Sequence, residues 1–403
     1  MRRTANFLAA LLLASGPLIG CHDALAQSRS PAPAVAALSA DRSDGAISFY
    51  RELAKRPGNI FVGPYSLEMA LAMAQAGARG RTAKEFDKVL GNNPARGLAA
   101  PAGNGLTFEV ANALWTRRGQ SLNSDYLAQI ATAFDGSVGA LDFSAPKSAA
   151  DTINRWASDK THGRISSVVS PAAFSSDTGL IMTDAVYFKG AWDSPFKPGD
   201  TYKDSFHLAS GRVVQTDTMH QTSNFELYIG KGFKLLVMYF KGGAEPVQMV
   251  VLLPDRPDGL PALEAKLNAA ALVDWISNAD ESRVDVALPK FTHADTVQLR
   301  DVVRSMGLST AFSATQADFS GITPLTQPRL HLADVIQSVF IDLNESGAEA
   351  AAVTAVTMAM ATAAPGQVSD PSVPFIADHP FVYLIRDEKT GDILFIGRMA
   401  APS

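Results

Sequence analysis

The sequence has one cysteine, Cys21, among its 403 residues, so no disulfide can form within one chain. A zinc site built from cysteines is excluded for the same reason. Charge is also sparse: 35 Lys and Arg against 40 Asp and Glu give a net charge of −5. This mildly acidic balance argues against nucleic acid or an anionic membrane as the main partner.

The motifs of common enzyme classes are missing. The seven histidines form no H-E-x-x-H pair, and the chain has no phosphate-binding G-x-x-x-x-G-K-[ST] loop. It also lacks a strand-linked G-x-G-x-x-G and the G-x-S-x-G elbow of the α/β-hydrolases. We therefore predict no metal site, no cofactor and no enzymatic activity.

One pair of short motifs suggests a hydrolase. Ser144 to Lys147 matches S-x-x-K, and Lys389 to Gly391 reads K-T-G, as in exported serine β-lactamases and penicillin-binding proteins. However, Pro146 lies inside the first motif, where a regular helical turn must hold lysine against serine. The second motif is better interpreted as a hairpin turn, with glycine supplying positive φ. An exported serine hydrolase is the weaker alternative.

The N-terminus has the pattern of an export signal, with two arginines before an apolar run from Phe7 to Gly20. Cleavage after Ala26 gives a signal peptide of residues 1–26. Cleavage before Cys21 gives a lipoprotein signal of residues 1–20 with a lipidated cysteine. Residues 27–40 are predicted to be a tether. The protein is expected to be secreted or periplasmic, either free or anchored through Cys21.

Hydrophobic periodicity predicts an α+β chain with one domain over residues 41–403. Residues 92–105 are expected to be a loop. The predicted helices cover 43–56, 64–78, 81–90, 124–134, 148–160, 261–277 and 296–306. The predicted strands cover 107–115, 136–143, 179–188, much of 212–254, 283–289, 331–343, 381–386 and 393–398.

An alanine-rich segment near the C-terminus carries the most information. Nine of the seventeen residues from Ala348 to Ala364 are alanine, and no charge occurs between Glu349 and Asp370. Alanine favours a helix, but several β-branched residues and the lack of a polar face argue against one. A linker is a second interpretation. The third is a buried strand, because alternate residues are small or apolar: Ala348, Ala350, Ala352, Thr354, Val356, Met358 and Met360. A segment that can be both exposed loop and buried strand is a candidate switch.

Several sequence blocks, in order, resemble the serpin family from about Ser43 to Pro402. The blocks are 59–67, 77–82, 110–115, 184–192 with 195–196, 288–291, 318–322, 378–381 and 393–398. The resemblance implies the serpin fold, with three β-sheets, about eight to nine helices and an exposed reactive loop at about 345–372. It also implies a suicide-type protease inhibitor, in which the cleaved loop inserts into the main sheet and traps the acylated protease.

The same resemblance assigns residues to that mechanism. The loop hinge matches Glu345, Gly347, Ala348, Glu349, Ala350, Ala351, Ala352 and Thr354. The family's spacing places the reactive bond between Ala361 and Thr362. Because the segment from Glu345 to Pro380 is longer than is common in the family, Met358 and Met360 are alternatives.

The region where the sheet opens matches Ser66, Asp184, Trp192 and Gln337. Serine, asparagine and histidine are usual in the family where this chain has Gly63, Asp184 and Gln337. Residues 91–106 lack the basic helix of glycosaminoglycan-activated members, so we expect no heparin activation. The expected partner is a target protease in a covalent acyl complex, and the chain is expected to be a monomer.

We call the segment between Glu345 and Ile385, which a target protease would attack, the bait. It contains no lysine or arginine, so the acidic specificity pocket of a trypsin-like protease would find no basic side chain to bind. We predict inhibition of elastase-like, subtilisin-like or chymotrypsin-like serine proteases, or of papain-like cysteine proteases. The alternative is a noninhibitory serpin that acts as a binding protein.

Overall fold

The computed structural model describes residues 33–90, 106–175, 177–242, 246–325, 329–348 and 371–402, without the side chains of residues 33–42. Several predictions lie outside these ranges: both export signals, the 92–105 loop, the hinge from Glu349 onward and the reactive bond with its alternatives.

The α+β class is confirmed. The helices of the described residues are α1 (Pro33–Ala54), α2 (Pro64–Gly77), α3 (Gly80–Leu90), α4 (Ser124–Ala133), α5 (Pro146–Lys160), α6 (Leu260–Lys266), α7 (Ala269–Ser277) and α8 (Arg300–Ser305). One sheet has six strands, in the order β10 (Phe291–Gln298), β11 (Leu332–Asn344), β12 (Gly347–Ala348), β4 (Leu180–Ala191), β2 (Leu106–Arg117) and β3 (Ser137–Leu141).

The second sheet has nine strands. Eight follow the order β1 (Ile60–Val62), β15 (Ile393–Met399), β14 (Phe381–Asp387), β8 (Val247–Pro254), β7 (Phe233–Tyr239), β6 (Val213–Gly230), β9 (Asp280–Pro289) and β13 (Val373–Ile376), and β5 (Thr201–His207) pairs with β6. The described residues thus form two sheets where three were expected. The reason is that β6 runs for 18 residues and pairs with β5 at one end and with β7 at the other.

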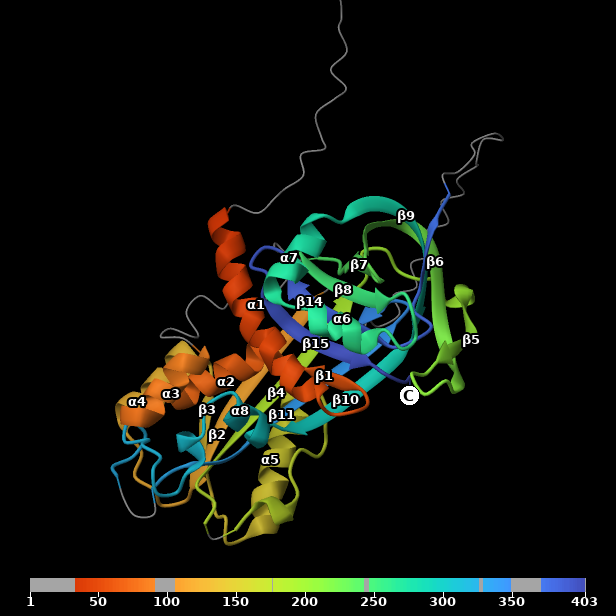
Figure 1. Cartoon of the computed structure of the whole chain (residues 1–403). Coiled ribbons are helices and arrows are strands. Elements are labelled where there is room, and N and C mark those ends of the chain that lie inside the picture. The colour runs from red at the N-terminus through yellow and green to blue at the C-terminus, as the bar shows by residue number, and fades with distance from the viewer. Residues whose placement is uncertain are drawn as a thin grey trace, which may run out of the picture. The chain divides into compact units, whose positions relative to one another are not determined.

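Apolar packing joins the layers. Helices α1, α6 and α7 contact the nine-stranded sheet (Figure 1). Between the two sheets lies a core cluster that contains Phe188 and Val339 of the six-stranded sheet and Phe395 of the other. The opposite face of the six-stranded sheet packs beneath α5 through Tyr187 and Phe340. Strands β4 and β11 are therefore covered on both faces, which explains their long apolar runs.

The centre of the six-stranded sheet is a parallel pairing of β4 with β11, which we call the seam. It runs from Leu180 opposite Leu332 to Tyr187 opposite Phe340. Beyond this point the two strands diverge, and β12 lies between them. Ala348 of β12 is antiparallel to both neighbours, opposite Leu343 of β11 and Gly190 of β4.

Three further sequence predictions need correction. Helix α1 begins at Pro33, so part of the predicted 27–40 tether is helical, consistent with its alanines and with proline in a first turn. The helix predicted over 261–277 is two helices, because Asn268 caps α7 by accepting a hydrogen bond from the Ala271 N–H. The helix predicted over 296–306 is α8 alone, since residues 296–298 belong to β10.

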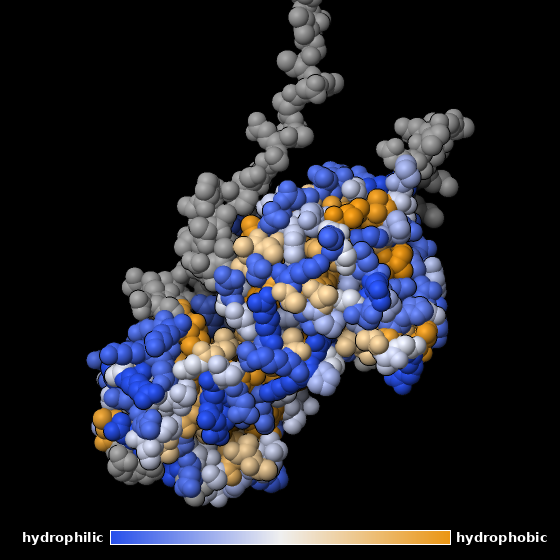
Figure 2. All heavy atoms as spheres, viewed as in Figure 1, coloured by the Kyte–Doolittle hydropathy of each residue, from blue (hydrophilic) through white to orange (hydrophobic). Residues whose placement is uncertain are grey.

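The surface drawn in Figure 2 is mainly hydrophilic, with hydrophobic residues in small separate patches. None of the helices in the described ranges is both long and apolar enough to cross a membrane.

Gly347 is the residue that fits β12 between its neighbours. Its φ is +138°, and a Cβ there would lie 2.0 Å from the Gly190 carbonyl oxygen. We predict that Gly347→Ala displaces β12, at a cost of about 1–3 kcal/mol from overpacking added to the strain of positive φ. Gly211→Ala is the control, because φ is +83° there but nothing lies within 4 Å. Urea unfolding should show a cost of about 1–2 kcal/mol for the control and clearly more for Gly347→Ala. Equal losses would contradict the tight fit.

Candidate functional site

The hinge begins inside the sheet. Ala348 has no exposed surface and belongs to the core between the sheets, together with Leu343 and Phe188. A small side chain fits because β4 presents Gly190 at this level. The structure therefore places Gly347 and Ala348 in the sheet and Glu345 in the turn that precedes them.

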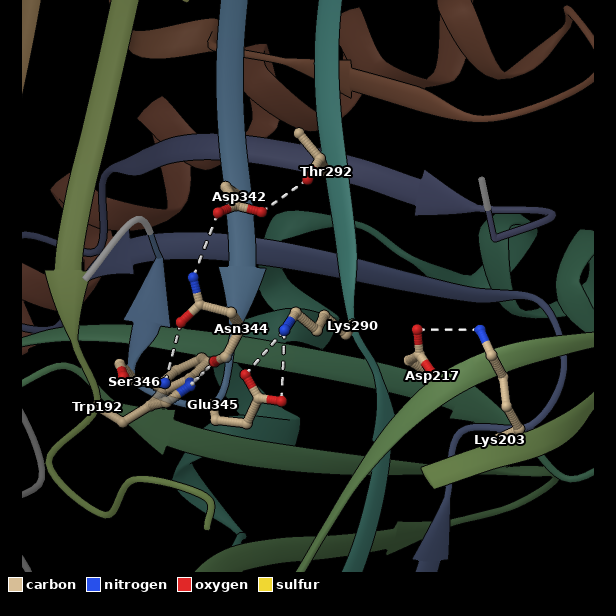
Figure 3. A network of polar contacts seen from close by, with 9 residues as sticks. All are labelled: Trp192, Lys203, Asp217, Lys290, Thr292, Asp342, Asn344, Glu345 and Ser346. Carbon is tan, nitrogen blue, oxygen red and sulfur yellow. Dashed lines mark hydrogen bonds and ion pairs between the residues drawn. The ribbon is translucent and has the colours of Figure 1, made fainter. Parts of the chain in front are cut away.

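Trp192, at the end of β4, fixes that turn (Figure 3). Its ring N–H donates to the Asn344 carbonyl at 3.0 Å, and its backbone N–H donates to the Ser346 carbonyl at 2.9 Å. The indole is stacked on Phe240, with the ring centroids 4.5 Å apart. Trp192 thus belongs to the hinge and is not hydrogen-bonded to the other predicted sheet-opening residues.

An ion pair holds the other side of the turn. The Lys290 ammonium lies 3.1 Å from Oε2 and 3.4 Å from Oε1 of Glu345 (Figure 3). Burial raises the pKa of Glu345, but hydrogen bonds from its own backbone amide and from Lys290 outweigh this effect and keep the pKa below its usual value. The sequence identifies Lys290 only as part of the block Leu288–Phe291, because nothing in it shows which acid this lysine faces.

The remaining sheet-opening residues meet across the seam. Asp184 of β4 and Gln337 of β11 are register partners, and Ser66 of α2 faces them. Oδ2 of Asp184 accepts from the Ser66 hydroxyl at 2.7 Å and from the Gln337 amide at 2.6 Å. The Gln337 amide also donates to the Gly63 carbonyl at 2.7 Å, and its oxygen accepts from the Gly63 N–H at 2.9 Å. We call Gly63, Ser66, Asp184 and Gln337 the polar cluster.

The departures from the family pattern fit one another. A Cβ on Gly63 would lie 3.0 Å from Ser66 Oγ and 3.5 Å from Gln337 Nε2. Glycine at this position thus makes room for the two-way pairing between its own backbone and the glutamine amide. Burial raises the pKa of Asp184 to about 7, although hydrogen bonds from Gln337 and Ser66 act in the opposite direction.

The turn after α5 covers the point where the seam ends, which the sequence did not reveal. Arg164 lies over the Phe340 ring, 5.4 Å from its centroid. The His162 ring packs edge-on against Tyr187 at 4.6 Å, and its Nε2 lies 2.7 Å from a Glu109 oxygen on β2. Parting of β4 and β11 at Tyr187 and Phe340 would therefore disturb this turn.

The groups that a hydrolase would need are occupied elsewhere. The Ser144 hydroxyl donates to Asp142 at 2.6 Å, and Lys147 pairs with Asp151 at 2.7 Å. Residues 389–391 form a turn between β14 and β15 in which Gly391 has a φ of +75°. Within the described ranges, no group of three or more His, Cys, Asp or Glu is arranged to hold a metal ion.

The six-stranded sheet thus combines a closed parallel seam between β4 and β11 with the short strand β12, which lies between these two strands at the head of the seam. Comparison with known proteins identifies the class. The family model for serpins (serine protease inhibitors) matches residues 41–402, and the chain belongs to this family. Its members include protease inhibitors and noninhibitory binding proteins.

Similar proteins come from distant organisms. A serpin-like protein of Thermococcus kodakarensis is 39% identical over 88% of this chain and 83% of its own. The crystal structure of Serpin48 of the insect Tenebrio molitor, a highly specific serpin, has a TM-score of 0.76 at 29% identity, covering 92% of this chain and 98% of its own. Human thyroxine-binding globulin, solved with its hormone, has a TM-score of 0.81 at 25% identity, covering 92% and 99%.

The Lys290–Glu345 pair gives a test of the hinge. We predict that Glu345→Lys lowers the melting temperature, because two ammonium groups would then face each other at the head of the seam. The loss should be modest, about 1 kcal/mol, since the lysine side chain is 42% exposed. The double variant Lys290→Glu/Glu345→Lys restores opposite charges and should recover most of the loss. If it melts no higher than the single variant, the pair does not stabilise the turn.

Proposed function

We propose that this chain is a suicide-type inhibitor of serine proteases that traps the acyl-enzyme by inserting its cleaved loop between β4 and β11. The observation that carries this proposal is the position of β12. We call the space between β4 and β11 the slot. Ala348 is already paired with both strands and buried, so the first inward residue of the hinge occupies the head of the slot.

Continuing the β12 register predicts the partners of the inserted loop. Ala350 would lie between Ile341 and Phe188, both of which are fully buried in the core between the sheets. Ala352 would lie between Val339 and Val186 in the same core. The inward residues of the hinge are thus small where the core is already closely packed.

Thr354 is the first polar inward residue, and the same register brings it between Asp184 and Gln337. Its hydroxyl can both donate and accept there, so it can replace the hydrogen bond that these residues make with each other in the closed seam. The order of polar and apolar residues in the loop matches the order along the slot.

Insertion is favourable because it replaces one strand pairing by two. The eight residue pairs of the parallel seam part, and the new strand is antiparallel to both neighbours. The inserted loop would also bury its small apolar side chains in the core between the sheets. The intact chain therefore stores free energy that cleavage releases.

The trapping step follows from this stored energy. The protease serine attacks the Ala361 carbonyl, the peptide bond to Thr362 breaks, and the new amine leaves as an acyl ester forms. If the loop inserts faster than water hydrolyses the ester, the protease remains attached. Met358 and Met360 remain alternative attachment points.

A noninhibitory binding function is the alternative, and the resemblance to human thyroxine-binding globulin keeps it open. The small, uncharged inward residues of the hinge favour inhibition. The N-terminal signal supports action outside the cytoplasm, and the family match over residues 41–402 supports a single domain.

A pair of neighbouring substitutions tests insertion. Ala350→Arg would place a charge between Phe188 and Ile341, which costs several kcal/mol unless the charge is paired, so insertion should stall and the protein should become a substrate. Glu349→Arg is the matched control, since the same side chain would lie on the other face of the strand, between Asp342 and Lys189 in this register, where neither neighbour is fully buried. Gel assays with a protease that forms an SDS-stable complex with the wild type should show the same complex for the control and only cleaved chain for Ala350→Arg. Equal complex formation by both would contradict the register.

Bait chemistry predicts specificity. Incubation with elastase, subtilisin, chymotrypsin, papain and trypsin should give stable complexes with one or more of the first four and not with trypsin, because the bait has no basic residue. Mass spectrometry of the released C-terminal peptide should show Thr362 at its N-terminus. A stable complex with trypsin alone would overturn the specificity.

A further inference from the structure

A row of buried polar side chains crosses the six-stranded sheet. Asn112 of β2, Asp184 of β4 and Gln337 of β11 are register partners from strand to strand. Their exposed fractions are 4%, 1% and 0%. Directly paired residues on neighbouring strands point to the same face, with Cβ atoms about 4.5–5.5 Å apart. Asp184 is thus within reach of both neighbours.

Two oxygen atoms in this row have no hydrogen-bond partner in the part of the chain that the structure describes. Oδ2 of Asp184 is satisfied by Ser66 and Gln337, but Oδ1 of Asp184 and Oδ1 of Asn112 are buried and unpaired among the described residues. Two acceptors cannot satisfy each other, and an unpaired buried acceptor is costly. A single proton on Asp184 Oδ1 would satisfy both, because a protonated carboxyl can donate to the Asn112 oxygen.

Among the described residues, no charged group offsets an ionised Asp184. The groups that face it are Ser66 and the Gly63 backbone from α2 and its N-cap, Gln337 from β11 and Asn112 from β2. None of them is charged. Burial is the main influence on the pKa of Asp184 and raises it to about 7, with only hydrogen bonds from Gln337 and Ser66 opposing it.

We infer that the closed seam holds one proton on Asp184, and that parting of β4 from β11 releases this proton to solvent. This inference rests on the inhibitory function proposed above and concerns how loop insertion is regulated. The sheet opens for the loop more readily at neutral and alkaline pH than at acidic pH.

The direction of this pH dependence follows from the pKa values of Asp184 in the closed and in the opened seam. In an opened seam water reaches Asp184, and its pKa falls toward the ordinary value of about 4. Below about pH 4 both forms are protonated, and the stabilisation of the closed form is fully present. It is lost as the pH rises toward the closed-form pKa of about 7. Within this window the opening constant rises by about tenfold per pH unit, and above it the constant levels off.

Asp184→Asn is the matched variant, since the amide has the same shape, can donate to Asn112 and does not titrate. Hydrogen exchange measured by mass spectrometry on peptides covering β4 and β11, corrected for intrinsic exchange rates, gives the opening constant between pH 5 and 8. We expect a steep rise for the wild type that flattens near pH 7, and no such dependence for the variant. Parallel pH profiles would overturn the inference.

Infrared spectra of the wild type give a second test that needs no variant to fold. The carbonyl band of a protonated carboxyl, shifted by ¹³C-aspartate labelling, should be present at pH 6 and lost by pH 8. A carboxylate already ionised at pH 6 would mean that the Asn112 amide donates to Asp184 and that the seam holds no proton. Neither experiment uses a protease, so loss of the inhibitory proposal and loss of the proton are separate outcomes.

Discussion

The parallel pairing of β4 with β11 is the constraint on which the rest of the structure depends. It closes the six-stranded sheet from Leu180 to Tyr187, yet both strands continue past it and leave room for β12. Apolar layers cover the two strands on both faces, between the sheets and under α5. A third strand inserted between them would therefore lie in an interior that is already packed. Only small side chains would fit on its inward face.

The molecule holds this sheet closed with polar contacts at three levels. Lys290 and Trp192 fix the turn above the seam, Arg164 and His162 cover the point where it ends, and the polar cluster ties Asp184 to Gln337 in its middle. Hydrogen bonds suit this purpose, because a bond broken between the strands can be exchanged for one with a polar residue of an inserted strand, and such an exchange has a small net cost. A purely hydrophobic seam would offer no such exchange.

Much of this could be predicted from sequence. The mostly apolar run of residues 179–188 predicted the buried strand β4, the period-two pattern of the hinge predicted a further strand, and ordered sequence blocks predicted the family. The contact between Ser66, Asp184 and Gln337 could be predicted only from the resemblance to serpins, because three residues so far apart in the sequence form no local pattern. Asn112, Lys290 and His162 were missed as site residues, although a lone polar residue in the apolar stretch from Val110 to Trp115 was a visible hint. The merging of two sheets depends on the length of β6, and strand boundaries are poorly fixed by periodicity.

The central claim is that the seam accepts the loop once the loop is cut. Thermal unfolding before and after a single cleavage in the bait, followed by circular dichroism, tests this most directly. The account predicts a sharp rise in the melting temperature on cleavage, because the inserted strand pairs with both β4 and β11 and relieves the strain of the intact chain. A melting temperature that is unchanged or lower after cleavage would contradict insertion and would leave the noninhibitory binding protein as the better account.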